Sequence, residues 1–302
     1  PGMVRLWGWE AFAHGAETVS YFRWRQAPMA QEQMHAGLLR PDSAPAPGLS
    51  ELRQLATEIA ALPEVSAPKA RVALVFDYPS SWAWTVQPQG ADFNYFRLCL
   101  SWYRAARKLG LSLDILPGST DDLDGYDLVL VPGLMTLPAA LRGALARLRG
   151  RALIGPRSNA RTETMALPIP LPPDLPGLDL TVTAVESLPP GTAVALAPKG
   201  AFVHWAEHLE GSAAASHTAP DGRPAIATAG PLTYIGGWPD TPTMIDLIDA
   251  ACTETGIPTV RLPEGLRLRD TATHRFVLNY GASPAEWDGT PIPAAGVSWH
   301  AL

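Results

Sequence analysis

Three patterns of apolar residues follow one another in the first 65 residues. Apolar residues in Val4–Ala16 cover a broad helical face, and Gly15 stands near its end, as a helix stop would. Thr18–Arg25 is rich in β-branched and aromatic residues, which predicts a strand. Leu49–Leu62 has helical spacing again, with Ser50 expected as its N-cap. One strand and two helices cannot close a core, so we expect the last piece of a repeating β/α architecture.

Short apolar runs alternate with helical segments from Arg71 onward. Val72–Phe76 is continuously apolar, which is typical of a parallel strand buried on both faces. Strands that alternate with helices over short links predict a doubly wound parallel sheet. The predicted strands are Val72–Phe76, Leu111–Leu116, Asp127–Val131, Ala152–Ile154, Thr181–Val185, Thr192–Leu196, Phe202–Trp205 and Leu232–Ile235. The predicted helices are one capped by Asp92 and ended by Gly110, then Pro138–Arg149 and Thr243–Thr255.

The end of the chain changes character once more. Val260–Arg269, Arg275–Asn279 and Gly296–His300 are short or alternating runs with turns between them, which predict a small all-β domain. The predicted fold class is therefore α/β, with three domains. They cover 1–66 (helix–strand–helix), 67–257 (doubly wound α/β) and 258–302 (all-β).

Composition narrows the classes of function. The 302 residues are 47% hydrophobic and 17% charged, with a formal net charge of -6, which argues against a nucleic-acid or anionic-membrane surface. No apolar run approaches the roughly 20 residues of a membrane span, and Pro1–Glu10 lacks a signal-peptide pattern. We expect a cytoplasmic protein, which fits two cysteines that are predicted to be reduced. Pro1 and Gly2 precede a helical run without an initiator methionine, which we interpret as a cut within a larger protein.

Motif searches in the sequence exclude several chemistries. GxSxG, P-loop, GxGxxG and HExxH patterns are absent. Cys99 and Cys252 lie within predicted helices, so we expect a reduced, buried pair and no amidotransferase-type nucleophile. Glu32-x-x-His35 could be half of a bundle-type metal site, but no second copy is present. We therefore predict neither a metal nor a cofactor.

The most informative segment is the loop of about 22 residues between Gln26 and Leu49, because loops of this length usually have a function. In a β/α barrel, such a loop at the carboxyl end of a strand carries active-site residues. Phe22, Glu32 and His35 would suit a monosaccharide, since sugars offer hydroxyls to carboxylates and imidazoles and C–H faces to aromatic rings. Alternatively, Phe22 and Trp24 are core residues, and Glu32 and His35 are solvated.

These residues also carry a resemblance to a known family. RLWGWEAFAHGAETVSYFRWRQAP, followed by EQMH at 32–35, resembles the end of the catalytic barrel in the family 42 glycoside hydrolases, the β-galactosidases. LVLVP at 128–132 and YIGGWPD at 234–240 support it. The resemblance implies a C-terminal remnant of a TIM (β/α)8 barrel, then a domain like the class I glutamine amidotransferases or flavodoxins without catalytic residues, then a small β domain.

The resemblance also assigns roles. It implies that Phe22 is the aromatic residue of a galactose pocket and that Glu32 and His35 hold sugar hydroxyls. The nucleophile and acid/base glutamates of the family correspond to no residue here, because they would precede Pro1, and so would the zinc-binding cysteines of some members. A retaining glycosidase needs two carboxyl groups about 5–5.5 Å apart. The complete protein is then expected to hydrolyse terminal β-D-galactosyl residues, and this chain alone to be inactive.

The resemblance further implies a homotrimer built by the α/β domain, with a galactoside as substrate. Two alternatives remain open at this point. One is a non-enzymatic oligomerisation domain with a degenerate barrel remnant. The other is an active amidotransferase-like or flavodoxin-like domain, which the missing phosphate loop and cysteine nucleophile disfavour.

Overall fold

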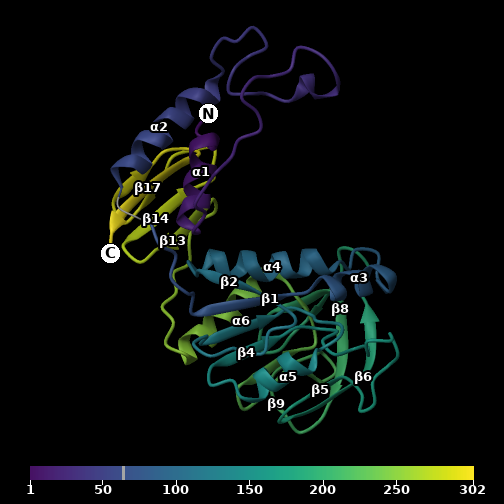
Figure 1. The fold of residues 1–302 in the computed structure, drawn as a ribbon. Helices are drawn as coiled ribbons and strands as arrows, with labels where there is room; N and C mark the ends of the chain where they lie inside the picture. Colours follow the sequence, from purple (N-terminus) through teal and green to yellow (C-terminus); the bar gives the residue numbers. More distant parts are fainter. Residues whose placement is uncertain (63–64) are drawn as a thin grey trace. The chain divides into compact units, whose positions relative to one another are not determined.

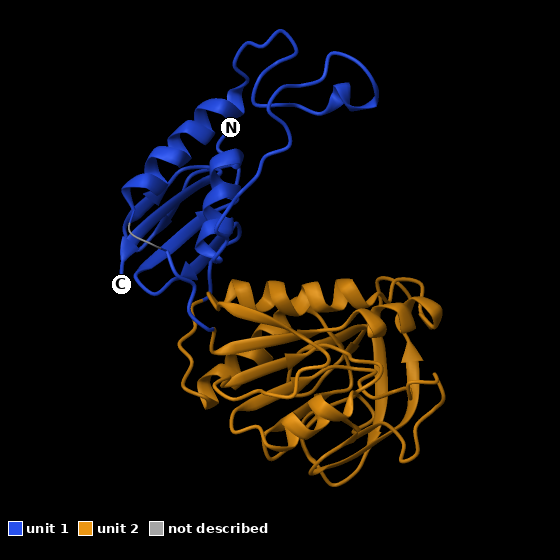
Figure 2. Cartoon of the chain, viewed as in Figure 1, with its two compact units in different colours: residues 1–69, 261–302 blue, residues 70–260 orange. Residues whose placement is uncertain are grey.

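The computed structural model describes residues 1–62 and 65–302 and divides the chain into two compact units. Unit 1 comprises residues 1–69 and 261–302, and unit 2 comprises residues 70–260 (Figure 2). The boundaries lie within a few residues of those predicted at 66 and 257. The two ends of the chain pack into one unit, whereas the sequence analysis assigned them to separate domains, and that three-domain division stays a prediction.

Unit 1 packs two helices against one face of a three-stranded antiparallel sheet (Figure 1). Phe276 and Leu278 pack with Trp9 beneath the helices, whereas Val277 packs with Ile292 on the other face, as strand alternation requires. The elements are α1 (Met3–Ala13), η1 (Gln31–Met34), α2 (Pro47–Ala61), β13 (Leu266–Asp270), β14 (His274–Asn279), β15 (Ala285–Trp287), β16 (Thr290–Ile292) and β17 (Gly296–Ala301). The predicted small β domain is thus present as a sheet, covered by the first two helices.

A carboxylate from α2 closes the amino end of α1. Glu51 accepts hydrogen bonds from the backbone N–H groups of Gly2 at 2.7 Å and Val4 at 2.9 Å. These N–H groups have no partner within the helix, and the helix dipole favours a negative charge at this end. Glu51 therefore stabilises α1 and joins the two helices.

A second carboxylate on α2 holds the side of α1. Glu58 accepts hydrogen bonds from Arg5 Nε and Trp9 Nε1, each at 2.8 Å. Burial raises the pKa of Glu58, but the hydrogen bonds from Arg5, Trp9 and Gln54 outweigh it, and the net result is a lowered pKa. The ionised form of Glu58 is therefore the one that holds the two helices together.

Unit 2 is built on a seven-stranded mixed sheet in the order β2-β1-β3-β4-β11-β10-β9. The first five strands of this order are parallel, and β10 and β9 continue the sheet antiparallel. The strands are β1 (Val72–Phe76), β2 (Leu113–Pro117), β3 (Leu128–Val131), β4 (Arg151–Ile154), β9 (Ala214–Thr218), β10 (Pro224–Ala229) and β11 (Leu232–Ile235). The parallel part of the predicted sheet is confirmed, and the sequence analysis missed the antiparallel extension.

Both faces of this sheet are buried. Leu128 and Leu130 of β3 face one core, whereas Val129 and Val131 face the other. α4 and α6 belong to the first core and α5 to the second, so helices cover both faces. The helices are α3 (Tyr78–Val86), α4 (Tyr95–Lys108), α5 (Ala139–Ala146) and α6 (Thr241–Glu254).

A second sheet packs beside the first within unit 2. Its order is β12-β8-β6-β5, with β7 also paired to β8. The strands are β5 (Pro173–Leu175), β6 (Leu178–Ser187), β7 (Ala193–Ala195), β8 (Ala201–Glu210) and β12 (Gly237–Pro239). β8 contributes Trp205 to one core and Leu209 to the other.

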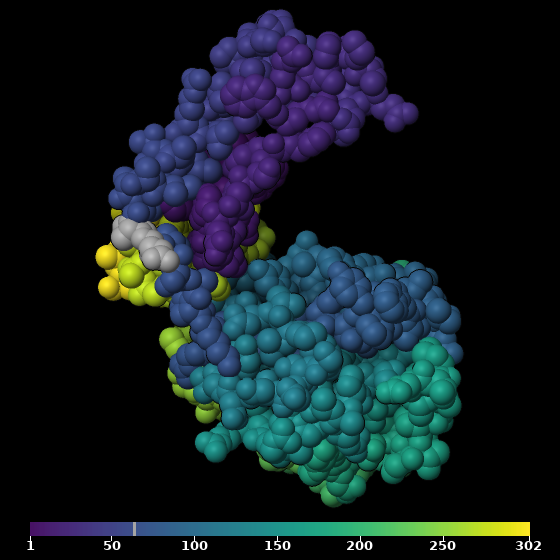
Figure 3. Space-filling model, in the orientation of Figure 1, coloured from purple at the N-terminus to yellow at the C-terminus, as the bar shows by residue number. Residues whose placement is uncertain are grey.

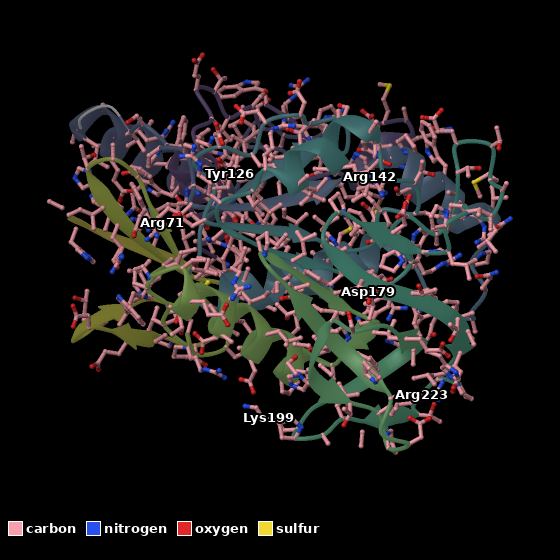
Figure 4. The ribbon with its side chains drawn as sticks, turned by 90° about the horizontal axis from the view of Figure 1, so that it is seen from below. Arg71, Tyr126, Arg142, Asp179, Lys199 and Arg223 are labelled. Atoms are coloured by element: carbon pink, nitrogen blue, oxygen red, sulfur yellow. The ribbon has the colours of Figure 1, made fainter. Side chains whose placement is uncertain are left out.

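Side chains on the surface of unit 2 join elements that are distant in the sequence. Arg71, just before β1, donates to the carbonyl oxygens of Thr255 and Gly256 after α6, each at 3.1 Å. Arg142 of α5 donates to Asp174 of β5 at 2.7 Å. Figure 4 labels Arg71 and Arg142, which lie in different parts of the unit.

Three local predictions are wrong. Thr18–Arg25 forms no strand: within the described part of the chain its only β-bridge is an isolated one between Arg25 and Leu39. Ser50 is not an N-cap, since α2 begins at Pro47 and the Ser50 hydroxyl donates to the Pro47 carbonyl. Asn94, not Asp92, caps α4 by accepting from Arg97 N–H.

Candidate functional site

The segment between α1 and α2 is held by backbone hydrogen bonds between its two arms (in purple in Figure 3). Leu38 N–H donates to the Arg23 carbonyl at 2.9 Å, and Leu39 N–H donates to the Trp24 carbonyl at 2.8 Å. A Cβ on Gly37 would lie 2.5 Å from the Gln26 nitrogen, so only glycine allows this close approach. The arms therefore have a fixed register although they form no regular strands.

Arg23 lies at the centre of the predicted site residues. Its guanidinium forms an ion pair with Glu32 and donates to the Glu32 carbonyl oxygen at 3.4 Å. The same guanidinium carbon lies 4.7 Å from the centre of the Phe22 ring. One side chain thus fixes Glu32 beside Phe22.

The short helix η1 places the remaining residue. His35 follows η1, and its N–H donates to the Glu32 carbonyl at 3.0 Å. The His35 ring meets the Phe22 ring edge-on, with 6.1 Å between their centres. Gln26 Nε2 donates to the Gln33 carbonyl at 2.6 Å and holds η1 against the first arm. The structure therefore brings together Phe22, Glu32 and His35.

This arrangement leaves polar and apolar groups open to a ligand. Phe22 is 68% exposed and Trp24 65% exposed, so their interpretation as core residues is wrong for this chain. Glu32 engages Arg23 through Oε2, and its other oxygen can accept a further hydrogen bond. A carboxylate, an imidazole and an aromatic ring on one surface can bind hydroxyls and a C–H face of a small polar molecule.

Arg23 is a candidate site residue that the sequence analysis missed. The sequence analysis places it within the predicted strand Thr18–Arg25 and gives it no role of its own. An arginine next to an exposed aromatic residue, nine positions before a glutamate, was the available signal. Only the folded loop shows that it contacts both.

A second charged cluster lies in unit 2, where the sequence analysis predicted no site. Glu207 of β8 is buried and accepts from Arg157 N–H at 2.9 Å, Trp205 Nε1 at 3.1 Å and Tyr234 Oη at 2.7 Å. Burial raises the pKa of Glu207, although these hydrogen bonds oppose the shift. Both oxygens of the carboxylate are therefore engaged by protein donors.

The guanidinium of Arg157 is also enclosed. It lies 4.7 Å from the Trp84 ring centre and 5.2 Å from that of Trp205, and it donates to the carbonyl oxygens of Gln87 at 2.7 Å and Pro88 at 3.1 Å. Burial lowers the pKa of Arg157 to about 10. A cavity of about 280 Å³ adjoins the cluster. The hydrogen bonds of Arg157 join the Gln87–Pro88 loop to β8, so the cluster has a structural role.

Both cysteines lie in a hydrophobic core of unit 2. Cys99 and Cys252 are free and buried, as expected, and burial raises the pKa of each thiol to about 12, which disfavours a nucleophile. In residues 1–62 and 65–302, no group of three His, Cys, Asp or Glu residues could hold a metal ion. Within the same residues, none of the helices combines the length and apolar character needed to cross a bilayer.

Comparison with protein families divides the chain near the boundary of the two units. Residues 70–258 match the family described as the β-galactosidase trimerisation domain, and residues 1–62 match the family described as β-galactosidase. Among curated proteins, a β-galactosidase from Thermus thermophilus is 46% identical over 291 residues, covering 95% of this chain and 45% of that protein. The chain thus spans about half the length of the curated relatives it matches.

Solved structures agree with the sequence matches. A β-galactosidase from the psychrophilic Marinomonas ef1 is 36% identical with a TM-score of 0.90, and 99% of this chain covers 49% of it. A β-galactosidase from the haloarchaeon Halorubrum lacusprofundi is 32% identical with a TM-score of 0.91, and all of this chain covers 50% of it. Both units therefore have the folds of the corresponding parts of these enzymes.

Proposed function

Because this chain belongs to the family 42 β-galactosidases, we propose that it supplies the galactose-binding wall and the assembly domain of a β-galactosidase. The full-length gene product then hydrolyses terminal β-D-galactosyl residues. The observation that carries the proposal is the cluster in which Arg23 holds Glu32 beside Phe22, with His35 against the same ring. Glu32 and His35 bind sugar hydroxyls, and Phe22 packs on a C–H face.

The chemistry itself is assigned to residues outside this chain. A retaining mechanism uses two carboxyl groups about 5–5.5 Å apart, one as nucleophile and one as acid and base. Glu32 is committed to Arg23 and matches a binding residue, so neither role is assigned to it. We therefore expect this chain alone to be inactive. A cytoplasmic location stays a prediction.

The fold assignments are part of the same proposal. In the complete protein, α1, the Phe22 segment and α2 would take the places of the last helix, strand and helix of a TIM barrel, although the Phe22 segment forms no regular strand in this chain. The strand order β2-β1-β3-β4 in unit 2 supports a doubly wound fold of the flavodoxin or class I amidotransferase kind, which shares this order at one edge. The match to a trimerisation domain supports a homotrimer built by this unit.

Kinetics with a nitrophenyl β-galactoside test the function. The full-length gene product should hydrolyse it, whereas the 302-residue chain should not. Glu32→Ala and His35→Ala in the full-length protein should each raise KM and lower kcat/KM by about tenfold or more, since a hydrogen bond to a charged group contributes about 1.5–3 kcal/mol. An unchanged KM in both variants would exclude these residues from the sugar pocket.

A further inference from the structure

One face of α3 consists of large apolar side chains that face solvent. Tyr78, Trp82 and Val86 follow one another at intervals of four residues and are 66%, 66% and 75% exposed. Residues four apart lie on the same helical face, so the three side chains form a line along the helix. The opposite face, with Ala83 and Trp84, is buried in the core.

This line continues onto the neighbouring helix. Phe96, near the start of α4, is 58% exposed. The Phe76 ring lies 5.2 Å from Tyr78 and 6.3 Å from Phe96, measured between ring centres, and so bridges them. Tyr78 and Trp82 lie 6.4 Å apart. We call Tyr78, Trp82, Val86 and Phe96 the aromatic stripe. Figure 3 shows the α3 and α4 segments, in blue, on the surface of unit 2.

The aromatic stripe is rigidly held. Asp77 caps α3 by accepting from Ser80 N–H at 2.8 Å, and the buried Trp84 ring packs 4.2 Å from Phe93, centre to centre. Single exposed apolar residues are ordinary, but a contiguous set of this size marks an interaction surface in soluble proteins. Aromatic residues are also enriched at the centres of protein interfaces. The stripe therefore has the composition and order of a contact surface.

We propose that the aromatic stripe is covered by a second copy of this protein in the homotrimer. The stripe lies within residues 70–258, the part that matches a trimerisation domain, and this match is the reason to propose another subunit as the occupant. A closed trimer has three-fold symmetry, so each contact joins two different surfaces. The stripe of one subunit thus meets a different face of the next. This inference rests on the trimer of the proposed function and adds the surface that forms it.

Light scattering on the full-length gene product tests the inference. Trp82→Glu and Val86→Glu each place a charge in the stripe, and each should lower the molar mass about threefold, from a trimer to a monomer. Ile169→Glu is the matched control, because Ile169 is also apolar, is 84% exposed and lies in unit 2 outside the stripe. The control should remain trimeric. Circular dichroism should show unchanged helix content in all three variants.

The possible outcomes distinguish failure of the proposed trimer from failure of the stripe as its contact surface. If the unsubstituted protein is monomeric, the trimer of the proposed function fails and the inference fails with it. If the unsubstituted protein and both stripe variants are trimeric, only the inference fails. A stripe variant that stays trimeric but unfolds at a lower temperature would show that another part of the same polypeptide covers the stripe, which also overturns the inference.

Discussion

Two clusters in this chain combine an arginine, a glutamate and aromatic rings, but one is exposed and the other is buried. In unit 1, the Arg23 guanidinium pairs with Glu32 and lies over Phe22, and the cluster is open to solvent. In unit 2, the Arg157 guanidinium lies between aromatic rings, and Glu207 accepts three buried hydrogen bonds. The same residue types can therefore form an exposed cluster in which one carboxylate oxygen remains open to a ligand, or a structural joint in which both carboxylate oxygens already accept protein hydrogen bonds.

The largest expected effect comes from breaking the buried cluster. Glu207→Ala leaves the N–H of Arg157, the indole of Trp205 and the hydroxyl of Tyr234 without their acceptor, so the free energy of unfolding should fall by about 3–5 kcal/mol. Urea unfolding of the 302-residue chain measures it. Glu207→Gln keeps the shape and one acceptor and should cost less. An effect of Glu207→Ala below about 1 kcal/mol would contradict the structural role.

A smaller effect, of a different kind, is expected at the exposed cluster. Arg23→Gln releases Glu32 and Phe22, so the KM of the full-length gene product should rise by about tenfold. The free energy of unfolding should change by less than about 1 kcal/mol, because the ion pair is at the surface.

Arg25→Gln is the matched control for this variant. Arg25 lies two residues further along the same loop and donates to Ser43 at 3.1 Å, away from the ion pair of Arg23 with Glu32. Its KM should stay unchanged. Equal KM values for the Arg23 and Arg25 variants would show that Arg23 does not position the binding residues.

The smallest effect concerns pH, where two buried or half-buried carboxylates should respond in opposite directions. The pKa of Glu58 is lowered in the folded chain from its usual 4.5, so its contribution to stability is present above pH 4.5 and is lost as the pH falls through the lowered value. The pKa of Glu207 is raised from 4.5, so stability is lost as the pH rises from 4.5 through the raised value.

Thermal unfolding between about pH 3 and pH 7 checks these signs. The difference in Tm between the unsubstituted chain and Glu58→Gln should shrink as the solution is acidified. For Glu207→Gln the unsubstituted chain should gain relative stability on acidification. Parallel Tm curves for the chain and both variants would contradict the assigned shifts.

Sequence patterns predicted the parts of the fold that depend on local periodicity. β1, β11 and β14 were found because short apolar runs mark strands buried in a sheet. α3 was missed, since its apolar residues occupy both its buried and its exposed faces and leave no polar stripe. The strand at Thr18–Arg25 was wrong because β-branched and aromatic content cannot supply the neighbouring strand that a sheet requires.

The candidate site was only partly predictable. Resemblance to a family indicated Phe22, Glu32 and His35 as site residues. The long loop predicted between Gln26 and Leu49 supported this assignment, because long loops usually have a function. Arg23 contacts Glu32 only because the loop folds back and brings the two residues together. The spacing of nine residues in the sequence does not predict this contact. In the Glu207 cluster, the hydrogen-bonded pair Arg157 and Glu207 is 50 positions apart along the chain, so no local pattern could reveal it.

The most direct test of the account is a crystal structure of the full-length gene product with galactose bound. We predict hydrogen bonds from sugar hydroxyls to the Glu32 carboxylate and the His35 imidazole, with the Phe22 ring against a C–H face of the sugar. Galactose bound in the catalytic barrel with all three side chains beyond contact distance would contradict the central claim.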